Sequence, residues 1–144
     1  LSGLYGVLRP LDLIQPYRLE MSTELKTGKA KNLYQYWGHK ITDLLNADIE
    51  ATKSKEVINL ASQEYMAAIQ VADLKAPVMD IQFLEDRNGK LQFLSYNAKR
   101  PRGWMARYIV DHKIKKSSEL KGFDVQGYSY REELSEPRKM VFVR

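Results

Sequence analysis

The dipeptide Asn88-Gly89 constrains the fold of this chain more than any other feature of its sequence. It lies between two runs of alternating apolar and polar residues, PVMDIQFLED before it and KLQFLSYNAK after it. Asn-Gly favours a two-residue turn with positive φ at both positions, and the twist of that turn matches the twist of two paired strands. The sequence therefore predicts an antiparallel β-hairpin, whose strands carry Val78, Ile81, Phe83, Leu91 and Phe93.

Helical and extended patterns flank this hairpin. Residues 32–49 carry apolar side chains three or four positions apart, which predicts a helix with Asn32 as its N-cap. Residues 56–62 form a short apolar run, which predicts a strand, and Ser62 is the expected N-cap of the helix that follows. The remaining predicted elements are a helix over about 102–113 and strands within 127–134 and 139–144.

Together these elements predict an α+β fold, a mixed sheet with a β-hairpin and flanking helices. The chain has 144 residues and contains no repeat, low-complexity tract or internal linker, so we expect a single domain over residues 1–144. Its first residue is Leu1, and LSGLYGVLRP resembles the interior of a protein. We therefore expect the domain to be N-terminally truncated, with an incomplete sheet.

Glycine and proline interrupt both helical and strand periodicity over the first 28 residues, because Pro10 and Pro16 restrict the backbone. This segment is too apolar for a free linker. We expect a structured loop whose apolar residues pack on the core: Leu4, Tyr5, Val7, Leu8, Leu11, Leu13 and Ile14.

Several function classes are excluded or disfavoured by composition. The absence of cysteine excludes disulfides and thiolate metal sites. No apolar run is long enough to span a membrane and no signal peptide opens the chain, so the cytoplasm is the expected location. His39 and His112 have no ligand partner at helical spacing, and no nucleophile–base pair is evident. We therefore predict neither a metal nor another cofactor.

Basic residues are concentrated in one stretch. Residues 99–116 contain seven Lys or Arg and one acid, a local charge of +6 against +5 for the whole chain. The first three, Lys99, Arg100 and Arg102, lie where a helix begins, and a helix N-terminus attracts anions. Each cation at this end interacts unfavourably with the helix dipole and lowers helix stability by about 0.3–1 kcal/mol. Because the cations do not stabilise the helix, a role in binding phosphate is favoured. The alternative is a solvated basic helix face, and this is the preferred interpretation for Lys113, Lys115 and Lys116.

Other candidates lie outside that stretch. Arg9, Tyr17 and Arg18 lie on the first loop, where polar residues often serve function; an internal pair of either arginine with a carboxylate, such as Arg18 with Glu20, is the alternative. The end of the predicted strand at 56–62 adds Asn59 and Ser62, at a position that ligands favour in open α/β sheets. Trp104 could stack on a base, but its helical spacing with Met105 and Tyr108 favours core packing instead.

Five blocks of sequence, in order along the chain, resemble the YaaA-type peroxide stress family. They are LSGLYGVLRPLDLIQPYRLEM (1–21), NLYQYWG (32–38), VINLASQEY (57–65), SYNAKRPRGWMARYI (95–109) and GFDVQGYSY (122–130). The resemblance covers the C-terminal part of the family only. It implies a cytosolic bacterial protein that supports survival under hydrogen peroxide and lowers available iron, so that iron-dependent (Fenton) damage is limited. It also implies a mixed α/β fold with a positively charged cleft that binds duplex DNA, and a helix-hairpin-helix element in the N-terminal portion.

The resemblance also implies which residues line that cleft. The matching positions are Arg9, Tyr17, Arg18 and Glu20 in the first block, Asn59, Ser62 and Tyr65 in another, and Lys99, Arg102, Gly103 and Arg107 in the basic block. Pro101 is a departure from the family's small residue, and it is compatible with the first turn of a helix.

Two functions of different classes follow. The first is a protective DNA-binding protein in which Lys99, Arg100, Arg102 and Arg107 neutralise phosphates of double-stranded DNA in the full-length protein, with no membrane and no protein partner. The second is an enzyme acting on a nucleotide, nucleic acid or other phosphorylated small molecule; whether the protein is an enzyme stays open. Direct iron sequestration ranks last, because no His/carboxylate cluster has ligand spacing.

Overall fold

A computed structural model describes residues 1–93 and 98–144 of the chain. The backbone divides into two compact units, each with its own contacts. Residues 1–55 and 61–77 form the helical unit, and residues 56–60 and 78–144 form the sheet unit.

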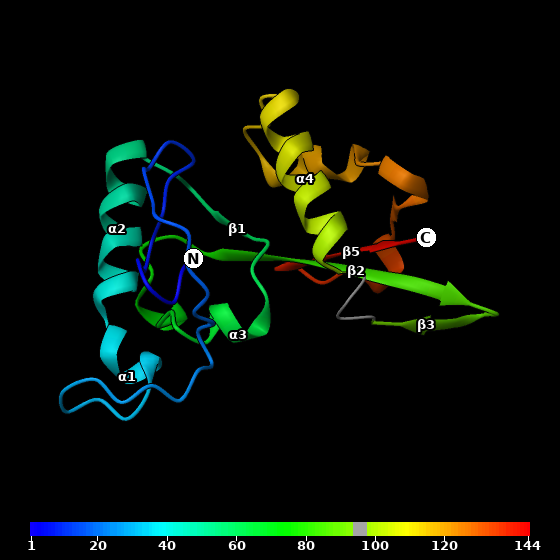
Figure 1. The fold of residues 1–144 in the computed structure, drawn as a ribbon. Helices are drawn as coiled ribbons and strands as arrows, with labels where there is room; N and C mark the ends of the chain where they lie inside the picture. Colours follow the sequence, from blue (N-terminus) through cyan, green and yellow to red (C-terminus); the bar gives the residue numbers. More distant parts are fainter. Residues whose placement is uncertain (94–97) are drawn as a thin grey trace. The chain divides into compact units, whose positions relative to one another are not determined.

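The helical unit packs helices on an irregular N-terminal segment. Its elements are α1 (Leu33–Trp37), α2 (Lys40–Thr52), α3 (Gln63–Met66) and the 3-10 turn η1 (Val71–Asp73). Figure 1 shows the N-terminal segment running alongside α2. Their shared core is formed by Met21, Leu33, Ile41, Ala68 and Ile69.

The helix predicted over residues 32–49 is present but is broken into α1 and α2. The break lies at Gly38, whose φ of 47° and ψ of −121° end the first helix. Asn32 is the N-cap, as predicted, and its side chain accepts a hydrogen bond of 2.9 Å from the Gln35 backbone N–H. Glycine at Gly38 permits a positive φ that other residues rarely adopt, so the apolar periodicity continues while the helix axis does not.

The sheet unit contains an open mixed sheet. Its strands are β1 (Val57–Asn59), β2 (Val78–Arg87), β3 (Lys90–Gln92), β4 (Ser129–Tyr130) and β5 (Lys139–Val143). The order is β1-β2-β5-β4, with β3 paired to β2. β2 is parallel to β1 and to β5, whereas β3 and β4 pair antiparallel with their neighbours. The predicted α+β fold with a mixed sheet is therefore confirmed.

The predicted hairpin is formed by β2 and β3. Asn88 and Gly89 both have positive φ, 56° and 79°, as the Asn-Gly turn requires. The Gly89 N–H also donates to the Asp86 carboxylate at 2.7 Å, which fixes the turn. Residues 94–97 of the predicted second strand lie outside the described residues.

One helix and several 3-10 turns complete the sheet unit. The helix is α4 (Lys99–Asp111), and the turns are η2 (Ser117–Gly122), η3 (Val125–Gly127) and η4 (Glu132–Leu134). Met105 of α4 packs with Ile81 and Phe83 of β2, and Trp104 packs against the same core, so its predicted core role is confirmed. The rest of this core consists of Leu120, Phe123, Tyr128, Met140 and Phe142. None of the helices within the described residues is both long and apolar enough to cross a membrane.

The prediction that the first loop packs on the core is correct for Val7 but wrong for four residues, Leu4, Leu11, Leu13 and Ile14, which are exposed. Val7 packs against the core of the helical unit. The side chains of Leu11 and Leu13 are instead 92% and 100% exposed. Local hydrogen bonds between Arg9 and Asp12 hold the backbone of this loop, and its apolar composition did not determine its burial.

Candidate functional site

The start of α4 carries three cations without the usual features of a helix N-terminus. Lys99 and Arg100 are its first two residues, three positions earlier than the sequence predicted, and Arg102 follows within the first turn. The N-cap is Ala98, whose side chain offers no hydrogen bond, and the first turn contains no acidic residue. The free N–H groups of the helix and the three cations therefore add their positive potentials at one end.

Arg102 is the least solvated of these cations. Its residue is partly buried, and burial lowers the pKa of its guanidinium below the ordinary value. Within residues 1–93 and 98–144 neither Arg102, Lys99 nor Arg100 has a carboxylate at ion-pair distance. A guanidinium that loses water without gaining an acid is disfavoured. An anion supplied from outside the chain would restore the lost interaction.

Further along α4, Arg107 lies within reach of an acid. Its Nε donates to Asp111 at 2.7 Å, a pair four residues apart on the exposed side of the helix. Such exposed pairs are worth about 0.3–0.5 kcal/mol. A phosphate can therefore compete with Asp111 for Arg107 at small cost.

Small residues separate the cations on the exposed side of α4. Gly103 and Ala106 are both exposed, between Lys99 and Arg100 at one end and Arg107 at the other. A Cβ added to Gly103 would meet no atom within 4 Å, so packing does not require glycine there. We did not single out Ala106 from the sequence, although its spacing of three residues from Gly103 would have placed it on this face.

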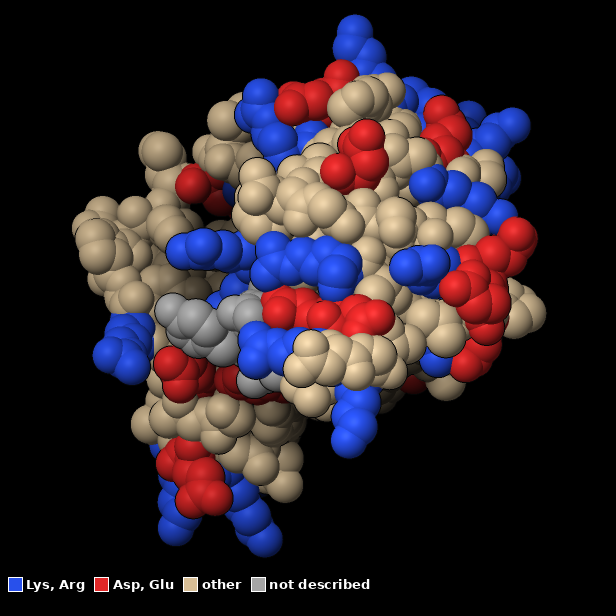
Figure 2. Space-filling view, turned by 90° about the vertical axis from the view of Figure 1, so that its right-hand side faces the viewer, with Lys and Arg blue, Asp and Glu red and all other residues tan. Residues whose placement is uncertain are grey.

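Elsewhere in the sheet unit, many basic side chains are paired with acids. Lys139 contacts Glu136 at 2.6 Å, and Arg144 contacts Glu85 at 2.8 Å. Figure 2 shows basic and acidic side chains interspersed on one face of the molecule. Clustering of basic residues alone therefore does not define a site, and neither does the lack of an ion pair, since within the described residues Lys90 and Arg138 have none either. The start of α4 differs because a partly buried arginine without an ion pair lies beside two exposed cations.

Asn59 and Ser62 have different environments. Asn59 ends β1 and its Nδ2 donates to Asp80 Oδ1 at 2.7 Å across the parallel β1–β2 pair, in which the two residues are in register. Ser62 is the N-cap residue of α3, as predicted, but its side chain makes no capping hydrogen bond. Asn59 belongs to the sheet unit and Ser62 to the helical unit.

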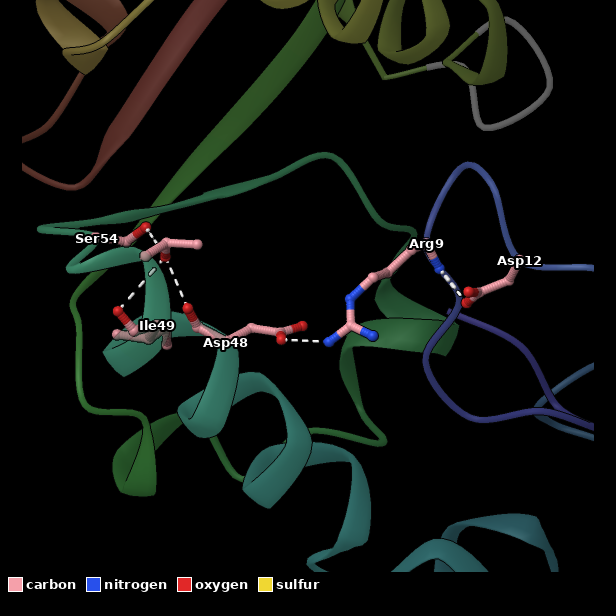
Figure 3. A network of polar contacts seen from close by, with 6 residues as sticks. Arg9, Asp12, Asp48, Ile49 and Ser54 are labelled. Atoms are coloured by element: carbon pink, nitrogen blue, oxygen red, sulfur yellow. Dashed lines mark hydrogen bonds and ion pairs between the residues drawn. The ribbon is translucent and has the colours of Figure 1, made fainter.

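The remaining predicted site residues lie in the helical unit. Arg9 donates from Nη2 to Asp48 of α2 at 2.5 Å (Figure 3), and this hydrogen bond raises the pKa of Arg9. This is the internal carboxylate pair that the sequence left open as an alternative. The Tyr17 hydroxyl is hydrogen-bonded to the buried Ser2 hydroxyl.

Arg18 is the most solvated of these loop residues. Its side chain is 92% exposed and lies 3.9 Å from Glu20, at the limit of an ion pair. The nine predicted residues thus divide between the units, and the convergence of all nine on one cleft stays a prediction. The structure brings together Lys99, Arg100, Arg102 and Arg107 on a single helix. Among the described residues, no group of three or more His, Cys, Asp or Glu is arranged to hold a metal ion.

The fold and these side chains define an α+β protein with an uncompensated cationic helix start. The model of the family described as peroxide stress protein YaaA matches residues 1–134, and the chain belongs to this family. Over all 144 residues the chain is 50% identical to a UPF0246 protein of Idiomarina loihiensis, 47% to one of Phenylobacterium zucineum and 50% to one of Caulobacter vibrioides. It spans 56%, 54% and 56% of their respective lengths.

Proposed function

We propose that the chain supplies a DNA-binding surface to a cytosolic protein that protects bacteria against hydrogen peroxide. The family name supports the link to peroxide stress. The observation that carries DNA binding is the start of α4, where the partly buried Arg102 has no carboxylate partner in the described part of the chain and two exposed cations lie beside it. Duplex DNA presents the dense line of phosphates that such a surface attracts.

The shape of the exposed side of α4 supports a backbone contact in particular. From Lys99 to Arg107 the helix rises about 12 Å at about 1.5 Å per residue. This length covers about three to four phosphates of one strand at about 3.4 Å of duplex axis each. Because Gly103 and Ala106 have small side chains, a sugar-phosphate chain can approach the helix backbone closely between the cations. Phosphate contacts position the duplex without reading its sequence.

Protection would follow from occupancy of the DNA surface. Cations held along the phosphates displace counterions, including iron, that would otherwise gather on the polyanion. Hydroxyl radicals formed by iron and peroxide act close to where they are generated, so less bound iron means less Fenton damage. In this proposal the effect on iron is a consequence of DNA binding and requires no metal site in the protein.

The direct test is a comparison of affinities for a short fluorescent duplex by anisotropy at about 100 mM salt. The variant that replaces Lys99, Arg100 and Arg102 by Gln should bind at least about tenfold more weakly than the original chain. Glutamine keeps a helix propensity close to that of Lys and Arg, so circular dichroism should be unchanged.

The matched control removes the same charge from another place. It replaces Lys113, Lys115 and Lys116, which follow the end of α4, by Gln. We expect a loss of less than about threefold, because net charge alone acts weakly through salt. Equal losses in the two variants would show that the start of α4 has no special role.

A second candidate is an enzyme acting on a nucleotide or other phosphorylated small molecule. The specific observation is the hydrogen-bonded pair of Asn59 and Asp80 at the end of β1, where ligands bind in open parallel sheets. Turnover of nucleotides or nucleic acid that is lost in an Asp80→Asn variant, with DNA affinity retained, would favour it. The absence of turnover across a broad panel would favour DNA binding alone.

A further inference from the structure

The first loop of the helical unit presents an unusual apolar surface. Residues 10–14, here called the apolar loop, carry Leu11, Leu13 and Ile14 with exposed fractions of 92%, 100% and 45%. Single exposed apolar residues are normal on a protein surface, but three large ones within four positions are not explained by composition.

Hydrogen bonds on both sides fix the backbone of the apolar loop. The Arg9 N–H donates to the Asp12 carboxylate at 2.7 Å, and the Asp12 N–H donates to the Arg9 carbonyl at 3.0 Å. Arg9 is also joined to Asp48 of α2 (Figure 3). After the loop, the Gln15 N–H donates to the Tyr5 hydroxyl at 3.1 Å. The leucines are therefore held in solvent by an ordered backbone, and such a surface loses little entropy when it is covered.

We infer that the apolar loop is a docking surface for the polypeptide that the longer family members carry outside the matched region. The Idiomarina and Caulobacter relatives are matched over only 56% of their length, so a large segment of each is available to cover it. Contact within one chain has a high effective concentration and avoids the entropy cost of association. An intramolecular contact can therefore form although only three apolar side chains of the loop contribute to it.

A second copy of the chain is a poorer occupant. Stable interfaces between proteins use about 20–30 residues on each side, many more than the three apolar side chains of this loop. The inference does not depend on DNA binding, since α4 belongs to the sheet unit and the loop to the helical unit.

The absence of cysteine in this chain makes a thiol probe available. The Leu13→Cys variant of the 144-residue chain is compared with the intact Idiomarina relative carrying cysteine at the aligned position as its only thiol. The rate of reaction with a maleimide is measured for both. We expect the rate in the relative to be lower by about tenfold or more, because a covered thiol reacts only when the contact opens.

Val71 provides the matched control, because it is 46% exposed in the same unit but lies outside the loop. Cysteine at Val71 and at its aligned position in the relative should react within about twofold of each other. Equal rates at the Leu13 position in both proteins would overturn the inference. Slowing that depends on the concentration of the 144-residue chain would also overturn it, since a second copy would then be the occupant. A circular dichroism spectrum of each variant ensures that folded proteins are compared.

Discussion

Replacing Arg102 by Gln should affect stability and DNA binding in opposite directions. Burial disfavours the charge of Arg102, and no carboxylate among the described residues compensates it. A neutral side chain of similar helix propensity removes that penalty, so the melting temperature should stay the same or rise. In the proposed complex the same side chain neutralises one phosphate. Its loss should make the slope of log K against log salt shallower by about 0.9.

The magnitude can be stated for an accessible range of salt. A slope of about 0.9 per contact means that one contact contributes about a 3.5-fold fall in affinity between 50 and 200 mM salt. Anisotropy titrations of duplex DNA at four salt concentrations resolve such a difference, and thermal melting followed by circular dichroism gives the stability. Arg144→Gln is the control. It removes the 2.8 Å contact of the mostly buried Glu85, which keeps its longer 3.4 Å contact with Arg87, so stability should fall modestly while the salt slope stays the same. A destabilised Arg102→Gln protein with an unchanged slope would refute the reasoning.

The other predictions concern single residues. Gly103→Ala should stabilise the protein by about 0.5–1 kcal/mol in urea unfolding, because the added methyl group meets open space, yet it should weaken DNA binding in anisotropy; stronger binding would contradict the backbone contact. Gly6→Ala should destabilise by about 1–3 kcal/mol in the same unfolding assay, because Gly6 has φ of 75° and its new Cβ would lie 2.9 Å from the Trp37 ring; a neutral result would show that this segment adapts. Asp111→Asn should release Arg107 and steepen the salt slope by up to about 0.9; an unchanged slope would mean that Arg107 makes no phosphate contact.

Local signals predicted the elements that local interactions determine. The hairpin follows from Asn88-Gly89, since only the turn and the alternating flanks are required. α4 was predicted with its core residues Trp104 and Met105, but its start was placed three residues too late. The reason is that Lys99 and Arg100 carry no signal typical of a helix N-terminus, and Ala98 is a weak N-cap.

Features that depend on contacts between residues far apart in the sequence could not be predicted from local patterns. Arg9, which precedes the exposed Leu11 and Leu13, is hydrogen-bonded to Asp48, 39 residues away, and no periodicity of the sequence predicts such a contact. The predicted strand at 56–62 is reduced to β1, Val57–Asn59, because within the described part of the chain it pairs with β2 alone, over these three positions. The expectation of one domain over residues 1–144 stays a prediction, since each unit has a core of its own.

For the candidate site, composition located the cations but not their partners. The basic stretch was visible as a charge of +6 over residues 99–116. The sequence could not show that Arg102 is partly buried and that burial lowers its pKa. It also could not show that Arg107 pairs with Asp111 while Lys99 and Arg100 have no acid at ion-pair distance. Ion pairs depend on rotamers and on side-chain geometry, and spacing alone does not determine them.

The central claim is that three uncompensated cations at the start of α4 bind DNA phosphates. The salt dependence of duplex binding by the unmodified chain tests it most directly. With Lys99, Arg100 and Arg102 each neutralising one phosphate, the account predicts a slope near −2.7, or about a 40-fold loss of affinity from 50 to 200 mM salt. A slope indistinguishable from zero, or no binding at 50 mM salt, would contradict it.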